Sequence, residues 1–385
     1  MATNNNDKTL NVPHLRFPEF SGEWRKERLF DIAELYKGVG ISKDQLSDDG
    51  KPCILYGELY TKYKSEIINE IISKTNIDTT KLVRSKANDV IIPCSGETAE
   101  DIATARCVLN DNIFLGGDLN IVRLYRYDGA FISYQLNGKR KYDIAKVAQG
   151  VSVVHLYGEH LKNVQTFNPG IEEQKKISRL LSILDERIAT QNKIIEDLKK
   201  LKSAITDSLF HSIADAHTIR LGEIAHITNG VGDVQDANTE HQEDWYPFFD
   251  RSEELKWFPT YSFDKEAVIY AGEGQSFYPR YYNGKFALHQ RCYAITDFAS
   301  CIIPKYCYHF MNTLNSYFVR NSVGSTVPSL RMDIFQKVEI RLPSIPKQQH
   351  ICKIIDAFYT KVEVEQRVIS TLQELKQFLL SQMFI

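Results

Sequence analysis

The sequence lacks the motifs with which most enzymes bind nucleotides, metals or acyl groups. Its 385 residues contain no GxxxxGKS or GxxxxGKT phosphate loop, no GxGxxG cofactor turn, no HExxH zinc motif and no nucleophile elbow. These absences weigh against nucleotide hydrolases, dehydrogenases, zinc proteases and acyl hydrolases. They indicate a chain without a catalytic site of its own.

One enzyme alternative stays open at this point. Glu97, Glu100 and Asp101 are close in the sequence, as the metal ligands of a nuclease would be. Acidic clusters of this density are more often solvated surface. A hidden endonuclease or methyltransferase would also need a cofactor loop, or a cluster of carboxylates and lysine in a concave pocket.

Paired cysteines and long apolar runs are missing as well. The seven cysteines are odd in number and include no CxxC spacing, which is typical of reduced thiols in the cytoplasm. Cys301, Cys307 and His309 lack the spacing of zinc ligands, so we expect no metal site. No run of 18 apolar residues occurs, and the chain starts with the polar MATNNNDKTL. The sequence therefore predicts a soluble, cytoplasmic protein with no membrane partner.

Neither sign of charge is in large excess. The chain has 47 basic and 49 acidic residues, which argues against a simple basic polyanion binder. The charges are unevenly distributed, because residues 280–341 carry eight Lys or Arg against three Asp or Glu, whereas residues 216–279 carry four against twelve. The basic segment is a candidate to face a phosphate backbone, and ordinary surface scatter is the alternative.

What the sequence does contain is a two-fold repeat. Apolar residues recur alternately four and three positions apart over residues 171–210 and again over 345–384, which is the spacing of a coiled-coil seam. The second seam follows the first by 174 positions. The seam residues are Ile177, Leu181, Leu184, Ile188, Ile195, Leu198, Ile205 and Leu209, then Ile351, Ile355, Phe358, Val362, Ile369, Leu372, Leu379 and Met383.

The repeat extends into the segments around these helices. RLFDIAELYKG at 28–38 is echoed by RLGEIAHITNG at 220–230, and Pro169 and Pro343 stand at matching places before the two helix starts. The interiors diverge and consist of short β-branched and aromatic runs separated by turn residues, which predicts strands. A repeated frame with different interiors is typical of two recognition modules on one scaffold.

Polar residues interrupt both seams at matching slots, namely Gln191 and Lys202 in the first and Glu365 and Lys376 in the second. An antiparallel alignment that places Lys202 opposite Glu365 also places Gln191 opposite Lys376. All apolar slots in the overlap then meet apolar partners. We predict an antiparallel helix pair in which these four residues fix the register.

Candidates for contact with DNA are basic, amide, hydroxyl and aromatic residues on expected turns. Arg and Gln can form bidentate hydrogen bonds with guanine and adenine edges. The turns 150–152 and 324–326 offer N–H and hydroxyl groups to a phosphate. A buried aromatic core is the alternative for the tyrosines. The candidates are Lys139, Arg140, Lys141, Ser152, Gln275, Arg280, Tyr281, Tyr282, His289, Gln290, Arg291, Ser325 and Thr326.

Together, LRFPEFSGEW near the start, the two RL-IA segments, the matching turns and the repeated NP or LP, I, Q, I pattern before a long helix resemble the specificity (S) subunit of type I restriction-modification systems. The resemblance covers nearly the whole chain. It implies an α+β fold with two globular α/β target-recognition domains, joined by two long antiparallel coiled-coil helices with pseudo-two-fold symmetry. The expected parts are an N-terminal strap at 1–24, recognition domain 1 at 25–168, a central helical spacer at 169–215, recognition domain 2 at 216–342 and a C-terminal helical spacer at 343–385.

The resemblance also implies a function and partners. Such a subunit is non-catalytic and recognises a bipartite site in double-stranded DNA with a fixed gap. It directs two methylation (M) subunits, which use S-adenosylmethionine, and restriction (R) subunits, which use ATP and Mg. No cofactor is expected in this chain, and the spacer helices are expected to dock the M subunits.

A coiled-coil adaptor with two protein-binding heads is the alternative from another class. Tight, strongly salt-dependent duplex binding by the assembled complex would argue against the adaptor.

Overall fold

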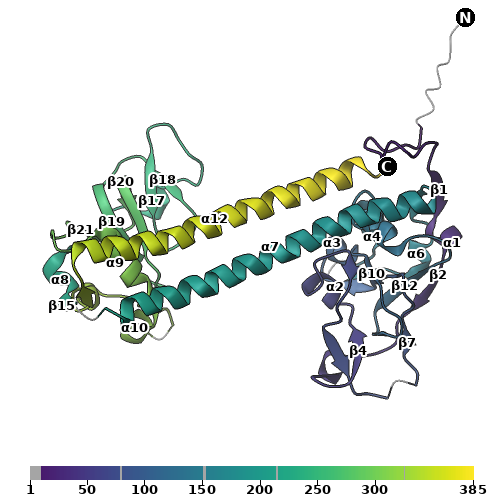
Figure 1. Cartoon of the computed structure of the whole chain (residues 1–385), viewed down its shortest axis with the longest axis horizontal. Coiled ribbons are helices and arrows are strands. Elements are labelled where there is room, and N and C mark those ends of the chain that lie inside the picture. Colours follow the sequence, from purple (N-terminus) through teal and green to yellow (C-terminus); the bar gives the residue numbers. More distant parts are fainter. Residues whose placement is uncertain (1–9, 79, 151–152, 214–215, 325) are drawn as a thin grey trace, which may run out of the picture. The chain divides into compact units, whose positions relative to one another are not determined.

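The structure is a computed structural model that describes residues 10–385 except 79, 151–152, 214–215 and 325. The chain forms two compact units, and each unit contains one half of either long helix (Figure 1). Unit 1 comprises Met1–Asn192 with Arg367–Ile385, and unit 2 comprises Lys193–Gln366.

Unit 1 holds two five-stranded sheets, with strand orders β2-β12-β8-β10-β5 and β3-β6-β4-β11-β7, and the two-stranded pairs β1-β14 and β13-β9. Its strands are β1 (Arg25–Arg28), β2 (Ala33–Lys37), β3 (Leu46–Ser47), β4 (Lys51–Ile54), β5 (Ile67–Ile68), β6 (Ser73–Thr75), β7 (Val83–Arg84), β8 (Asp89–Pro93), β9 (Ser95–Gly96), β10 (Arg106–Val108), β11 (Phe114–Leu115), β12 (Leu119–Leu124), β13 (Val154–His155) and β14 (Gln165–Asn168). Its short helices are α1 (Leu29–Ile32), α2 (Glu58–Thr61), α3 (Ala99–Ile102), α4 (Gly129–Asn137), α5 (Lys141–Val147) and α6 (Gly158–Leu161), with a 3-10 turn at Lys43–Gln45.

Unit 2 is built on one six-stranded sheet of order β16-β21-β19-β20-β17-β18 and the pair β15-β22. Its strands are β15 (His217–Arg220), β16 (His226–Asn229), β17 (Tyr246–Phe249), β18 (Lys256–Phe258), β19 (Phe263–Ala271), β20 (Arg280–Leu288), β21 (Cys292–Thr296) and β22 (Glu339–Leu342). Its short helices are α8 (Leu221–Ile224), α9 (Pro304–Asn312), α10 (Asn315–Asn321) and α11 (Met332–Gln336), with a 3-10 turn at Val234–Asp236.

The two long helices are α7 (Ile171–His211) and α12 (Ile345–Gln382), shown in teal and yellow in Figure 1. Both begin two residues after the matching prolines, as the sequence predicts. Each side chain of the predicted seams is buried or half-buried. The α+β class with two α/β domains and two long antiparallel helices is confirmed. No helix in the described part of the chain is long and apolar enough to cross a membrane.

Gln174 anchors the start of α7 to the recognition domain of unit 1. Its Nε2 donates to the carbonyl of Pro169 over 2.8 Å, and its Oε1 accepts from the backbone N–H of Asp128 over 3.0 Å. Asp128 is the N-cap of α4. The side chain is 1% exposed, so both hydrogen bonds lie away from water. One amide therefore satisfies two buried backbone groups of different elements.

Gln348 repeats this arrangement at the start of α12. It donates to the carbonyl of Pro343 over 2.9 Å and accepts from the N–H of Ile303 over 2.9 Å. Ile303 is the N-cap of α9, the counterpart of α4. The glutamine in both copies of the I, Q, I pattern thus has a physical role that the pattern alone does not reveal.

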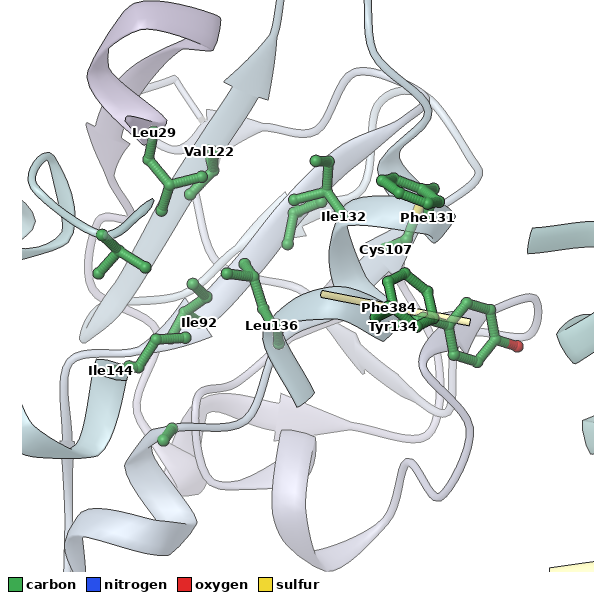
Figure 2. Close-up of a cluster of buried hydrophobic side chains, with 14 of the residues drawn as sticks. Leu29, Ile92, Cys107, Val122, Phe131, Ile132, Tyr134, Leu136, Ile144 and Phe384 are labelled. Atoms are coloured by element: carbon green, nitrogen blue, oxygen red, sulfur yellow. The ribbon is translucent and has the colours of Figure 1, made fainter. Parts of the chain in front are cut away.

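The larger core of unit 1 lies between α4, the strands β8 and β12, and the ends of α7 and α12. Figure 2 shows its side chains, with those of α4 at the centre. Phe384 reaches this core from the C-terminal end of the chain, and its ring centroid lies 5.2 Å from that of Phe131. Trp24 is 1% exposed and packs edge-on against both rings.

The N-terminal strap binds the helix ends as well as the domain that follows it. Arg16 forms two 2.8 Å hydrogen bonds to the carboxylate of Glu173, near the start of α7. The N–H of Leu15 donates to the carbonyl of Gln382 at the end of α12 over 2.9 Å. The strap therefore joins the start of α7 to the end of α12 within unit 1.

The helices are antiparallel, and Lys376 and Lys202 have partners outside the predicted alignment, which itself stays a prediction. In unit 1 the ammonium of Lys376 lies 2.6 Å from Asp185 Oδ1 and 2.6 Å from Glu66 Oε2. The sequence alignment placed Lys376 opposite Gln191, six positions further along α7. Two carboxylates outside the seam, one of them from the recognition domain, therefore pair with this lysine in charge-assisted hydrogen bonds.

Unit 2 shows a similar contact. The ammonium of Lys202 lies 3.9 Å from the ring centroid of Tyr359, and the predicted partner Glu365 is six positions further along. The 174-position repeat converts Lys202 into Lys376 and Tyr359 into the position of Asp185, so the two contacts are equivalent.

We predict that Gln348→Ala lowers the free energy of unfolding by at least about 2 kcal/mol, because three backbone groups, those of Ile303, Pro343 and Cys301, lose a hydrogen-bond partner. Gln349→Ala is the matched control, since its side chain is exposed in the same turn, and its change should stay within about 0.5 kcal/mol. Chemical denaturation of both variants checks this. Equal effects would show that the buried amide does not anchor α12.

Candidate nucleic-acid interface

The turn between β20 and β21 displays three of the predicted contact residues, His289, Gln290 and Arg291. Its backbone is fixed on both sides: the N–H of His289 donates to Phe249 O over 2.9 Å, and that of Gln290 donates to Gly232 O over 3.1 Å. The side chains of Gln290 and Arg291 are exposed. The turn therefore presents an amide and a guanidinium from a rigid base.

Three glycines allow neighbouring loops to approach this turn closely. A Cβ atom on Gly230 would lie 2.0 Å from Leu288 O, and one on Gly272 would lie 2.0 Å from Arg291 O. A Cβ on Gly232 would lie 2.7 Å from the ring of Phe248. Any side chain at these positions would displace the turn, so glycine is required for the close approach.

Two further loops meet at this place. Gly274 N donates to Pro328 O over 3.0 Å, and Leu330 N donates to Gly272 O over 2.7 Å, which joins the loop after β19 to the loop before α11. Gln275 and Thr326 are exposed on these loops. The structure therefore brings Gln275, His289, Gln290, Arg291 and Thr326 to one end of the sheet of unit 2.

A hollow of about 520 Å³ lies beside the turn. Lys256 and Arg251 line it, and neither residue is among the contacts that the sequence predicts. Lys256 forms a 2.7 Å ion pair with Asp250, while Arg291 forms a 2.8 Å pair with Glu273 and keeps 67% of its side chain exposed. Only the folding of β17 and β18 against β20 places Arg251 and Lys256 here, and no local pattern signals that.

Three other candidates in unit 2 have structural roles. Arg280 donates to the carbonyl of Ser252, and Tyr281 donates to the carboxylate of Glu266. Tyr282 packs against Phe286, with ring centroids 5.6 Å apart. Both tyrosines are half-buried, and their contact with DNA stays a prediction.

Unit 1 contains the same frame of loops. Leu156 N donates to Cys94 O over 2.8 Å, as Leu330 N does to Gly272 O in unit 2. Isolated bridges join Gln149 to His155, and Val323 to Ser329 in unit 2.

The positive-φ glycines Gly150 and Gly324 occupy matching places in these loops, with φ of 122° and 100°. Ser152 and Ser325 lie outside the described residues, so their predicted contacts stay predictions.

The displayed turn differs in chemistry between the units. β2 pairs with β12 as β16 pairs with β21, so the turn before β12, residues 116–118, is the counterpart of 289–291. Its sequence is Gly-Gly-Asp instead of His-Gln-Arg. Asp118 lies 3.8 Å from Lys37 and accepts a hydrogen bond from Ser95. An acidic turn of this kind does not suit a phosphate backbone.

The predicted basic group of unit 1 lies elsewhere, between α4 and α5. Arg140 donates to the carbonyl of Ile385 over 2.6 Å and pairs with Asp143 over 3.0 Å, so its guanidinium is engaged within the protein. Lys139 is exposed and Lys141 is half-buried. The structure does not bring these three residues to the loops that correspond to the displayed turn of unit 2.

Reactive groups are scarce in the described part of the chain. Its cysteines are free thiols, and burial raises the pKa of Cys53 to about 11 and that of Cys94 to about 12, which keeps both protonated at neutral pH. Glu97 and Glu100 are exposed, and Asp101 accepts from Thr98 Oγ1. Among the described residues no group of three or more His, Cys, Asp or Glu is placed to hold a metal ion.

Comparison with known proteins identifies the family of this chain. The sequence profile of the family described as "Type I restriction modification DNA specificity domain" matches the chain twice, at residues 21–200 and 214–374. The two matches follow the internal repeat and together cover most of the chain.

Two curated relatives are similar to parts of the chain. The type I restriction enzyme EcoDI specificity subunit of Escherichia coli is 32% identical over 165 residues, which is 43% of this chain and 36% of that protein. The MjaVIII specificity subunit of Methanocaldococcus jannaschii is 26% identical over 202 residues, 51% of this chain and 43% of that protein. The chain thus spans less than half of the length of these relatives.

Solved structures show the same fold over nearly the whole chain. The S subunit of a type I restriction-modification system from M. genitalium superimposes with a TM-score of 0.64 at 17% identity, over 97% of this chain and 99% of that one. A chain from a structure on complex assembly and conformational transition of the type I R-M system gives a TM-score of 0.58 at 16% identity, over 94% and 97%.

The displayed turn of unit 1 depends on the repeated glycine at its side. A Cβ on Gly38, the counterpart of Gly230, would lie 2.0 Å from Gly116 O, whereas one on Gly40 would have no atom within 4 Å. We predict that Gly38→Ala lowers the free energy of unfolding by about 1–3 kcal/mol. Gly40→Ala should change it by less than about 0.5 kcal/mol, and thermal unfolding of the pair would refute the close approach if both variants behaved alike.

Proposed function

Because this chain belongs to the type I restriction-modification DNA specificity family, we propose that it is a non-catalytic specificity subunit for double-stranded DNA. Each of its two recognition domains binds one half of a bipartite target. The helices α7 and α12, which run through both units, set a fixed gap between the halves.

The observation that carries this proposal is the contrast between the two displayed turns. The frames of the units agree in their strand pairing, loop bridges and helix anchors, yet one frame displays His-Gln-Arg and the other Gly-Gly-Asp. Two corresponding frames of strand pairs and loops with different displayed chemistry are what recognition of two different half-sites requires. An enzyme would instead need one shared constellation of reactive groups.

In unit 2 the proposal assigns a role to each group at the turn. Gln290 and Arg291 reach the major groove, where amide and guanidinium groups form bidentate pairs with adenine and guanine. Arg251 and Lys256, beside the hollow, contact phosphate oxygens, which fixes the position of the turn on the duplex. The domain of unit 1 reads its half-site with other loops, because its turn is acidic.

The partners belong to the proposal as well. We place two M subunits, with S-adenosylmethionine, on the long helices, and R subunits, with ATP and Mg, in the complete complex. Large apolar side chains are exposed on both helices, among them Leu201 at 50% and Phe378 at 55%, and such groups are typical of surfaces that bind other proteins. The cytoplasmic localisation stays a prediction from the sequence.

We predict that the double variant Gln290→Ala and Arg291→Ala changes recognition at one or two base pairs of a single half-site. Each lost bidentate pair is worth about 1–3 kcal/mol, which corresponds to roughly 5- to 150-fold in discrimination at that base pair. The measurement is a map of N6-methyladenine in cells that carry the variant and its methylating partner.

Lys337→Ala is the control for lost charge, since its ammonium pairs with Asp333 on the surface of the same unit. It should leave both half-sites unchanged. Altered recognition in both half-sites after the double substitution, or unchanged recognition in both, would contradict the role given to the turn.

A further inference from the structure

A largely buried ion cluster joins three separate parts of unit 1. Lys376 of α12 lies between Asp185 of α7 and Glu66, which precedes β5, with both N–O distances at 2.6 Å. The side chains of Lys376, Glu66 and Asp185 are only 12%, 10% and 8% exposed. We call these three residues the ionic joint.

Neutral groups complete the hydrogen bonds of the ionic joint. Tyr134 Oη donates to Asp185 Oδ2 over 2.7 Å, and Ser65 Oγ donates to the same oxygen over 3.1 Å. The carbonyl of Glu66 accepts from the N–H of Cys107 over 2.8 Å and from Ser133 Oγ over 3.0 Å. The recognition domain therefore holds Glu66 and Asp185 in position from several sides.

A second cation, Arg106, lies behind the ionic joint and is 8% exposed. Its guanidinium donates to the carbonyl of Tyr63 over 3.1 Å. The positive charges of Arg106 and Lys376 together balance the negative charges of the Glu66 and Asp185 carboxylates. Burial raises the pKa of the Glu66 carboxyl against the opposing attraction of Lys376, and burial lowers the pKa of Arg106. Burial therefore opposes ionisation at both sites, and opposite charges compensate for it.

Such a cluster contributes positional information more than stability. Burying charges has a large desolvation cost, and well-packed apolar replacements of buried ion pairs are often neutral or stabilising. The apolar residues of the seam alone fix the alignment of α7 and α12 only weakly, because they recur with each heptad. Lys376 meets both carboxylates in one alignment of the helices and in one placement of the recognition domain.

We propose that the ionic joint positions recognition domain 1 on the helix pair and thereby keeps the gap between the two half-sites at a single length. This proposal rests on the function proposed above. Lys376, Glu66 and Asp185 are positioning residues, because they act on the DNA only through the placement of the domain.

Unit 2 has no equivalent ionic joint at the corresponding place among its described residues. Tyr359 replaces the aspartate, and Lys202 packs over its ring at 3.9 Å. His309 and Lys305 contact Asp356 at 3.0 Å and 2.8 Å. The joint of unit 1 therefore differs in chemistry from its counterpart and can be altered independently.

The test replaces the three charged side chains of the ionic joint with neutral ones, in variants that all keep Arg106. The triple variant Glu66→Gln, Asp185→Asn and Lys376→Met removes all three charges at similar volume. Lys376→Met alone leaves two buried carboxylates without their lysine and should unfold at a lower temperature. Lys200→Met is the control, because Lys200 forms an exposed ion pair with Glu196 on α7.

Full-length chains with the methylating partner are compared in cells by mapping N6-methyladenine. We expect wild type and Lys200→Met to give one gap length, and the triple variant to methylate the same half-sites at a second gap that differs by one base pair. A single unchanged gap in a folded triple variant would overturn the proposal. So would altered half-site bases with an unchanged gap.

Hydrogen–deuterium exchange of the purified chains keeps the two proposals separable. The triple variant should exchange faster than wild type over residues 58–68 and 372–380, with no change around 289–291. If the wild-type chain itself gives no split motif, the proposed function fails. The exchange data then test by themselves whether the ionic joint positions recognition domain 1 on the helices. Unchanged protection in both segments would overturn it.

Discussion

One buried glutamine connects each long helix to the domain that precedes it in the chain. Gln174 and Gln348 each accept from the N-cap of a domain helix and donate to a proline carbonyl just before the long helix begins. Both bonds are shielded from water, so they hold the passage from strand to helix in place in both copies. The paired strands β1-β14 and β15-β22 support the same junction from the other side.

This common junction leaves the interiors free to differ. Unit 1 carries a second five-stranded sheet, whereas unit 2 folds β17 and β18 onto a single six-stranded sheet. The loops at the end of each frame keep their hydrogen bonds while the displayed turn changes from Gly-Gly-Asp to His-Gln-Arg. A scaffold of this kind allows the recognition loops to change while the contacts that attach the domain to the long helices stay the same. In our proposal, the ionic joint of unit 1 then positions recognition domain 1 on these helices.

The sequence predicts those features that depend on local pattern. The seams, the helix starts after Pro169 and Pro343 and the repeated Gly38 and Gly230 follow from spacing, and the structure confirms them. The alignment of the helices stays a prediction, because the contacts of Lys376 and Lys202 do not fix which seam residues face each other. No local pattern reveals Glu66 as a partner of Lys376, because the two residues lie 310 positions apart.

The candidate DNA contacts show the same limit. Turn residues such as Gln290 and Arg291 stand out in the sequence, and they are exposed in the structure, but their contact with DNA stays a prediction. The sequence does not reveal Arg251, because only the pairing of β17 with β18 and β20 brings it beside the turn. Arg140 was selected by its charge, although its guanidinium binds the carbonyl of Ile385 at the chain end. Local composition identifies exposed turns, whereas tertiary packing decides which charges remain available.

The central claim is that this chain determines which DNA sites are modified. The most direct test is a genome-wide map of N6-methyladenine in cells with and without the gene, in the presence of an active methylating partner. The account predicts a split motif with one constant gap that disappears when the gene is deleted and returns on complementation. A motif that persists unchanged after deletion, with the partner still active, would contradict the account.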